Sequence, residues 1–194
     1  MLKRICPFIA LLLLISLCAC KDKKKSASGE EDGYMSVRQF LDDQWNTLQG
    51  QPFTYTRIIS LNGTTDTSFV PLDKQLWNTI RKPFDEADIS SQKFMGKYNF
   101  SVAEDQVNGL VNFNYEARSP DEYTQKMIIV MDGFNHRAKS VYIETLKKSN
   151  VYYRSQKLNY IPGRSIMIQE FEKSTAAPQK DLRIVYALPD KYND

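Results

Sequence analysis

The sequence predicts an α+β domain with two N-terminal helices packed on a curved, mainly antiparallel β-sheet. Two segments near its start, 36–49 and 73–88, have the apolar spacing of amphipathic helices. From residue 97 onward, apolar and polar residues alternate, with a turn signal after each run. Connections this short leave no room for a crossover helix, so neighbouring strands should be antiparallel and form a meander. A long twisted meander can also curl into a half-barrel.

Start and stop signals bound the two predicted helices. Ser36 and Gln39 form a capping-box pattern at the first helix, and Gly50 follows its end. Asp73 is the expected N-cap of the second helix. Pro83 lies inside that helix and is expected to kink it or divide it in two.

Nine strands are expected. The pair Asn62-Gly63 predicts a hairpin turn between a strand beginning near Phe53 and a return strand at 65–70. Both faces of several strands carry apolar residues, which indicates a sheet that is covered on both sides. The remaining seven strands are expected at 97–104, 109–118, 123–131, 138–147, 151–159, 164–173 and 181–188.

The first 19 residues have the pattern of an export signal. Lys3 and Arg4 precede an apolar run that is about half the roughly 20 residues needed to span a bilayer. The run ends in Leu17-Cys18-Ala19-Cys20, which resembles the lipobox of bacterial lipoproteins. The resemblance implies cleavage after Ala19, a diacylglycerol on the Cys20 thiol and a fatty acyl chain such as palmitate on its amine. The alternative is an ordinary cleaved signal followed by a free cysteine.

Residues 20–33 have the composition of a flexible tether between the lipidated cysteine and a single domain at 34–194. A basic block, a small-residue spacer and an acidic block follow one another there, with almost no apolar side chain. Lys21 after the cysteine is similar to outer-membrane sorting signals. The chain as a whole resembles uncharacterised outer-membrane lipoproteins of Bacteroidota. We therefore expect a lipid-anchored protein of the outer membrane, with the periplasmic and surface faces both open.

Composition argues against several classes of function. The formal net charge of +3 includes the two basic residues of the signal, so a near-neutral mature chain offers no electrostatic case for nucleic acid. All three cysteines lie at or before Cys20, which leaves the domain without disulfides or thiol chemistry. His136 is the single histidine, so we expect no metal site, no cofactor and no catalytic dyad.

The chain is rich in tyrosine, which suits both sheet packing and binding surfaces. The candidate residues of a ligand groove are Tyr142, Tyr153, Tyr186 and Trp45, with plain cross-strand packing as the alternative. Neighbouring acidic pairs such as Asp121-Glu122 lie in turns or on helix surfaces, and they do not indicate the facing carboxylates of a glycosidase.

These observations predict a membrane-anchored envelope lipoprotein whose domain is a non-catalytic binding or assembly module. The order of its elements is similar to that of the half-open barrels of envelope lipoprotein carriers. Its partners are expected to be the membrane, through the N-terminal lipid, and an apolar, glycan or protein ligand. The alternative is a hydrolase acting on an envelope glycan or peptide. No residue is assigned a catalytic role.

Overall fold

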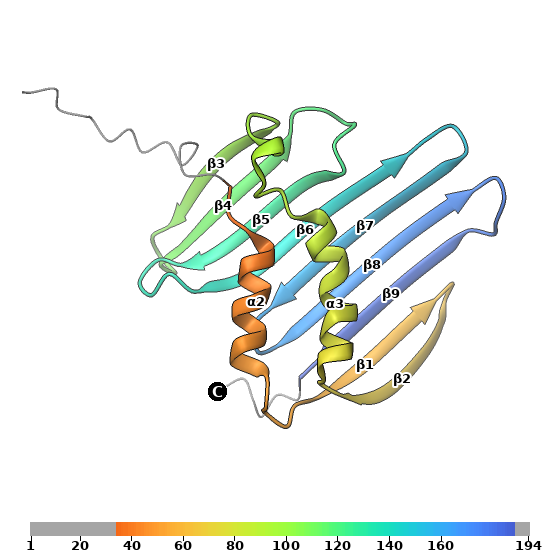
Figure 1. Ribbon diagram of the computed structural model, residues 1–194, viewed down its shortest axis with the longest axis horizontal. Coiled ribbons are helices and arrows are strands. Elements are labelled where there is room, and N and C mark those ends of the chain that lie inside the picture. The colour runs from red at the N-terminus through yellow and green to blue at the C-terminus, as the bar shows by residue number, and fades with distance from the viewer. Residues whose placement is uncertain (1–33, 189–194) are drawn as a thin grey trace, which may run out of the picture. The chain divides into compact units, whose positions relative to one another are not determined.

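The computed structural model describes residues 34–188, which contain a nine-stranded antiparallel sheet and two α-helices (Figure 1). The helices are α2 (Val37–Leu48) and α3 (Lys74–Ala87), and a short 3-10 helix η1 (Gln92–Phe94) follows. The strands are β1 (Thr54–Leu61), β2 (Thr64–Pro71), β3 (Tyr98–Asp105), β4 (Leu110–Ala117), β5 (Thr124–Asp132), β6 (Ala138–Lys148), β7 (Tyr152–Ile161), β8 (Ser165–Ser174) and β9 (Lys180–Ala187).

The predicted fold class, α+β with two N-terminal helices on the sheet, is wrong. The domain is mainly β, because nine strands form its frame and the two helices have only 12 and 14 residues. The helices do not form an N-terminal pair either. The hairpin of β1 and β2 lies between them in sequence and belongs to the same sheet as the later strands.

The sheet is a meander extended by that hairpin. Its strand order is β2-β1-β9-β8-β7-β6-β5-β4-β3, and β1 pairs antiparallel with β9. The strand positions and their antiparallel pairing were predicted correctly. The sheet is open, with β2 and β3 at its two edges.

Local signals explain both helices. The Ser36 side chain accepts a hydrogen bond from the Gln39 N–H at 3.1 Å, and Asp73 caps α3 through the Leu76 N–H at 2.7 Å. Helix α3 continues through Pro83, so the expected division of this helix does not occur. Since the preceding turns of α3 bury their apolar stripe against the sheet, packing holds the helix together across the missing hydrogen bond.

Both helices lie on the same side of the sheet, which we call the helix-side face (Figure 1). Trp77 of α3 is 1% exposed, stacks on Trp45 of α2 and meets Tyr160 of β7 edge-on. Arg81 joins the two helices, since its guanidinium lies 2.6 Å from an Asp42 oxygen and 2.8 Å from an Asp85 oxygen. The opposite face, the open face, has no helix on it among the described residues (Figure 1).

No helix between residues 34 and 188 combines the length and the apolar character that a bilayer crossing requires. The predicted signal peptide, its cleavage after Ala19, the lipidated Cys20 and the tether at 20–33 all lie outside the described residues.

Candidate functional site

Side chains on the helix-side face change from apolar to polar along the central strands. Tyr160 of β7 touches Trp77, so its side chain faces the helices. Its partners across the ladder face the same way, and so does every second residue along each of these strands. One row of this face is apolar and buried, and it consists of Ile143, Leu158 and Ile168. The next row toward the far strand ends is equally buried but polar, and it consists of Thr145, Gln156 and Glu170. In Figure 1 these strand ends extend past α3.

Glu170 is the centre of the polar row. It is 6% exposed, and three side chains bind its carboxylate. Arg154 donates from Nε at 2.8 Å and lies 2.6 Å away through Nη2. Gln156 Nε2 donates at 2.8 Å, and Lys180 Nζ donates to the other oxygen at 2.9 Å. The carboxylate is therefore fully engaged by the protein itself.

The ionised form of Glu170 is favoured. Burial acts to raise the pKa of this carboxyl, but hydrogen bonds from Lys180 and Arg154 outweigh burial, so its pKa lies below the ordinary value. Burial likewise acts to lower the pKa of Arg154, and the bond to Glu170 raises it. The pair is charged at neutral pH, and Arg154 has little freedom to turn away from Glu170.

Gln156 connects this charged pair to a tyrosine. Its Oε1 accepts hydrogen bonds from the Tyr123 hydroxyl at 3.0 Å and from Thr145 Oγ1 at 3.3 Å. Since its amide nitrogen donates to Glu170, Gln156 fixes Tyr123 and Arg154 relative to one another. Satisfied buried polar networks of this kind hold side chains in one geometry.

A cleft of about 600 Å³ opens beside this network. Its walls come from the end of α3, the loop before β5, the end of β6 and the start of β7. The lining residues are Glu86, Pro120, Asp121, Tyr123, Leu146, Lys147, Lys148 and Arg154.

The cleft has cations available to a ligand. Lys147 and Lys148 are exposed and make no ion pair within residues 34–188. Arg154 is 29% exposed, and its Nη1 makes no hydrogen bond among the described residues. A carboxylate or phosphate group in the cleft would meet the fixed Arg154 and the exposed Lys147, which is paired with it across β6 and β7. Glu86 and Asp121 also line the cleft and place negative charge in it.

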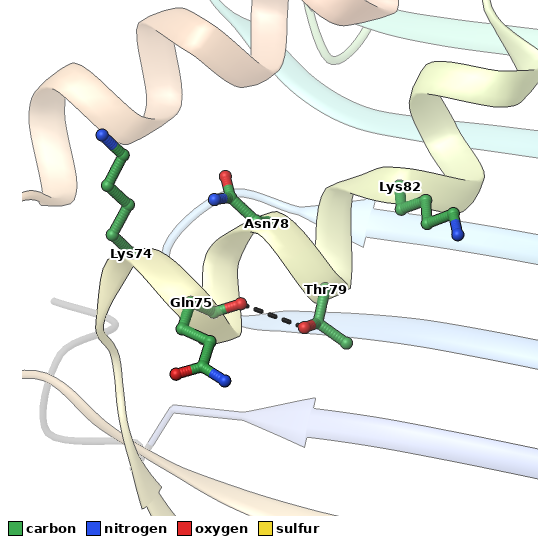
Figure 2. A pocket seen from close by; sticks show the side chains of 5 residues that line it. All are labelled: Lys74, Gln75, Asn78, Thr79 and Lys82. Carbon is green, nitrogen blue, oxygen red and sulfur yellow. Dashed lines mark hydrogen bonds between the residues drawn. The ribbon is translucent and has the colours of Figure 1, made fainter.

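A second hollow, on the exposed side of α3, has a different character (Figure 2). Lys74, Asn78 and Lys82 recur every four residues and form one stripe of the helix. Figure 2 shows the hydrogen bond from Thr79 Oγ1 to the Gln75 carbonyl at 3.0 Å, which is local to the helix. No buried charged residue of the described chain supports this hollow, so it is an ordinary solvated helix surface.

Comparison with known proteins gives no match, either to a protein-family model or to a curated protein. The functional assignment therefore depends on the geometry of the chain itself.

The four residues of the predicted groove do not come together. Tyr142 alternates with Val141 and Ile143, so it lies on the open face, as does Tyr153. Tyr186 is 4% exposed on the helix-side face, and Trp45 packs on Trp77 on the same side. Burial and a 2.5 Å hydrogen bond to Glu144 raise the pKa of Tyr142 to about 12, which keeps its hydroxyl neutral.

The structure places the single histidine in a turn and the acidic pair Asp121-Glu122 in the loop before β5. His136 lies in the turn between β5 and β6 with a φ of +56°. Within the described part of the chain, no cluster of histidine, cysteine, aspartate and glutamate side chains could hold a metal ion. Asp121 lines the cleft, whereas its neighbour Glu122 forms an ion pair with Lys97 at 2.9 Å.

The polar row under the cleft was missed from the sequence, although a signal for it existed. Arg154, Gln156, Leu158 and Tyr160 share one side of β7, so two polar residues occupy the same face as two core residues. In β8, Glu170 likewise follows Ile166 and Ile168 at the same spacing. Polar residues at positions that should be buried indicate a hydrogen-bonded network, because burial without partners is costly.

Proposed function

We propose that this protein is a lipid-anchored envelope protein whose domain is a non-catalytic binding module, and that its cleft takes an anionic group of a ligand. The observation that carries the proposal is Arg154, which a buried carboxylate, Glu170, holds in one orientation at the cleft wall. A cation fixed before binding loses little freedom when the ligand arrives.

The chemistry of the anion follows from the donors. Arginine presents N–H groups in a planar fork that matches carboxylate and phosphate oxygens, and lysine adds a mobile point charge. Lys147 is paired directly with Arg154 across β6 and β7, and Lys148 is the next residue of the lining. A ligand with a carboxylate or a phosphate is therefore favoured over an uncharged glycan or a purely apolar molecule.

The network argues for binding and against hydrolysis. A general acid at neutral pH needs a carboxyl whose pKa is raised, as in glycosidases. Glu170 has a lowered pKa, because Lys180 and Arg154 stabilise its charge against the cost of burial. Its oxygens are already occupied by three donors, so it has neither a proton to give nor a lone position from which to attack.

The anchor part of the proposal comes from the lipobox resemblance at Leu17-Cys18-Ala19-Cys20. Replacing Cys20 with alanine should leave the precursor unprocessed and free of diacylglycerol. Mass spectrometry of the detergent-extracted protein would measure the acyl mass. A Cys20→Ala protein that matures and fractionates like the parent would contradict the anchor.

The cleft is tested by titrating the protein with inorganic phosphate and, separately, with acetate while recording amide NMR shifts. We expect saturable shifts that centre on Tyr123, Lys147 and Arg154. The double variant Lys147→Gln with Lys148→Gln should bind phosphate several-fold more weakly. The matched control is Lys74→Gln with Lys82→Gln, which removes the same charge from the hollow of Figure 2.

Equal weakening in both double variants would mean that phosphate responds only to overall charge, and it would contradict a site in the cleft. Shifts spread over the whole surface would contradict it equally.

A further inference from the structure

Two hairpin loops of the sheet are built in the same way. The loop between β3 and β4 runs Asp105-Gln106-Val107-Asn108-Gly109, and the loop between β5 and β6 runs Asp132-Gly133-Phe134-Asn135-His136. Each begins with aspartate, has an apolar residue two positions later and asparagine next. Each ends on a residue with positive φ, +64° at Gly109 and +56° at His136. We call these the twin loops.

The two aspartates hold the twin loops in shape. Asp105 Oδ1 accepts hydrogen bonds from the N–H groups of Val107 at 3.0 Å and of Asn108 at 3.2 Å. Asp132 Oδ1 accepts from Phe134 at 3.0 Å and from Asn135 at 3.2 Å. Because both carboxylates bind the backbone beneath the tips, each apolar residue is presented on an ordered turn.

The twin loops also touch one another. The Gly133 N–H donates to the Gly109 carbonyl at 2.7 Å, and the neighbouring residues Leu110 and Asp132 are paired across β4 and β5. The Phe134 ring lies against Gly109, where a β-carbon would collide with it. The tips Val107 and Phe134 therefore lie at the same end of the sheet on two loops that touch, and we call this pair of side chains the apolar projection.

This projection is the most exposed apolar feature of the described chain. Val107 is 92% exposed and Phe134 is 87% exposed, above the other large apolar side chains there. Two side chains on convex tips offer far less than the roughly 800 Å² per partner of a standard protein interface. They suit a surface that admits single apolar side chains, and the interfacial region of a bilayer does so.

We infer that the twin loops insert Val107 and Phe134 into the surface of the bilayer to which the protein is anchored. The inference rests on the proposed lipid anchor, because two apolar side chains alone give weak binding. The lipid anchor keeps the twin loops at a high effective concentration near the membrane. A weak contact is then enough to orient the domain.

The chain is long enough for this arrangement. Tyr34 is bonded to the Tyr98 carbonyl at the start of β3, and the tip of the first loop follows the end of that strand, about 25 Å away. The 14 residues from Cys20 to Tyr34 can span up to about 46 Å. The anchor and the twin loops can therefore reach the same membrane surface.

The test uses the mature lipidated protein reconstituted in phosphatidylcholine vesicles. A polarity-sensitive fluorophore is attached at Val107→Cys, which is the sole free thiol once Cys20 carries lipid. The matched control label is at Val151→Cys, which is 59% exposed in the turn between β6 and β7 at the opposite strand ends. Nitroxide-labelled lipid serves as the quencher.

We expect a blue-shifted emission and at least twofold stronger quenching at position 107 than at position 151. Adding Phe134→Ser should reduce the quenching at 107, because the second tip no longer holds the loops in the bilayer. Equal quenching at 107 and 151 on protein that floats with the vesicles would overturn the insertion and leave the anchor intact. Protein that does not float with the vesicles would overturn both the anchor and the insertion.

Discussion

The helix-side face has an apolar half and a polar half, and the same strands contribute side chains to both. Under α2 and α3, the strands present Ile143, Leu158 and Ile168, which are buried against the helices. One row further along, the same strands present Thr145, Gln156 and Glu170, and these are just as buried. Apolar residues of similar size would have extended the core at lower cost, since burying polar groups requires compensation. The polar half therefore needs hydrogen bonds of its own, and under the proposed function these bonds hold Arg154 at the cleft.

The largest effect on stability is expected in the apolar half. Replacing Trp77 with alanine removes a side chain that is 1% exposed and that packs on Trp45 and Tyr160. The cavity and the lost transfer free energy should lower the free energy of unfolding by about 3–5 kcal/mol. Urea denaturation measures this change. A loss below about 1 kcal/mol would mean that the helices contribute little to the stability of the sheet.

A smaller loss is expected in the polar half. In Glu170→Gln, Arg154 and Lys180 lose their anion but keep partial contact with water, since their side chains are 29% and 41% exposed. The free energy of unfolding should fall by about 1–3 kcal/mol, less than for a fully buried pair. Glu116→Gln in β4, where the glutamate side chain is 61% exposed, is the control and should change it by about 0.5 kcal/mol or less. Equal effects in the two variants would contradict the special position of Glu170.

The pH dependence of stability gives a second test of Glu170 in the polar half. The pKa of Glu170 is lower in the folded protein than in the unfolded chain, because hydrogen bonds from Lys180 and Arg154 outweigh its burial. Its stabilisation is therefore complete above the unfolded pKa of about 4.3 and is lost as the pH falls through the folded pKa. The stability difference between the parent and Glu170→Gln should shrink below about pH 4. A difference that stays constant down to pH 3 would contradict this assignment.

The smallest effect on stability is expected at the cleft rim. Lys147 and Lys148 are exposed and have no ion pair within the described range, so replacing both with glutamine should change the free energy of unfolding by about 0.5 kcal/mol or less. The same variant should lose phosphate affinity. Thermal denaturation would check the first expectation, and a large loss of stability would show that the lysines belong to the folded framework.

Local signals in the sequence predicted the elements well. Asn62 and Gly63 have φ values of +49° and +86°, as a tight hairpin turn requires, and Ser36 and Asp73 cap their helices. Each of these signals acts over a few residues, so it can be read without knowing the fold.

The fold class and the site depended on non-local pairing. Nothing local in β1 indicates that it pairs with β9, more than 100 residues later, and that pairing makes the first hairpin part of one dominant sheet. Tyr142, Tyr153 and Tyr186 could not be assigned to a face until the strand register was known. Arg154 and Glu170 needed the same register, because only pairing across β7 and β8 brings their side chains together.

The proposed anion binding in the cleft requires that Glu170 hold Arg154 in one orientation. The most direct measurement compares phosphate affinity between the parent protein and Arg154→Lys, with amide NMR spectra confirming that both are folded. The lysine keeps the charge but lacks the planar fork that Glu170 orients. We predict binding that is weaker by about tenfold, which corresponds to about 1.4 kcal/mol. Equal affinity in the two proteins, or no saturable binding in the parent, would contradict the role of Arg154.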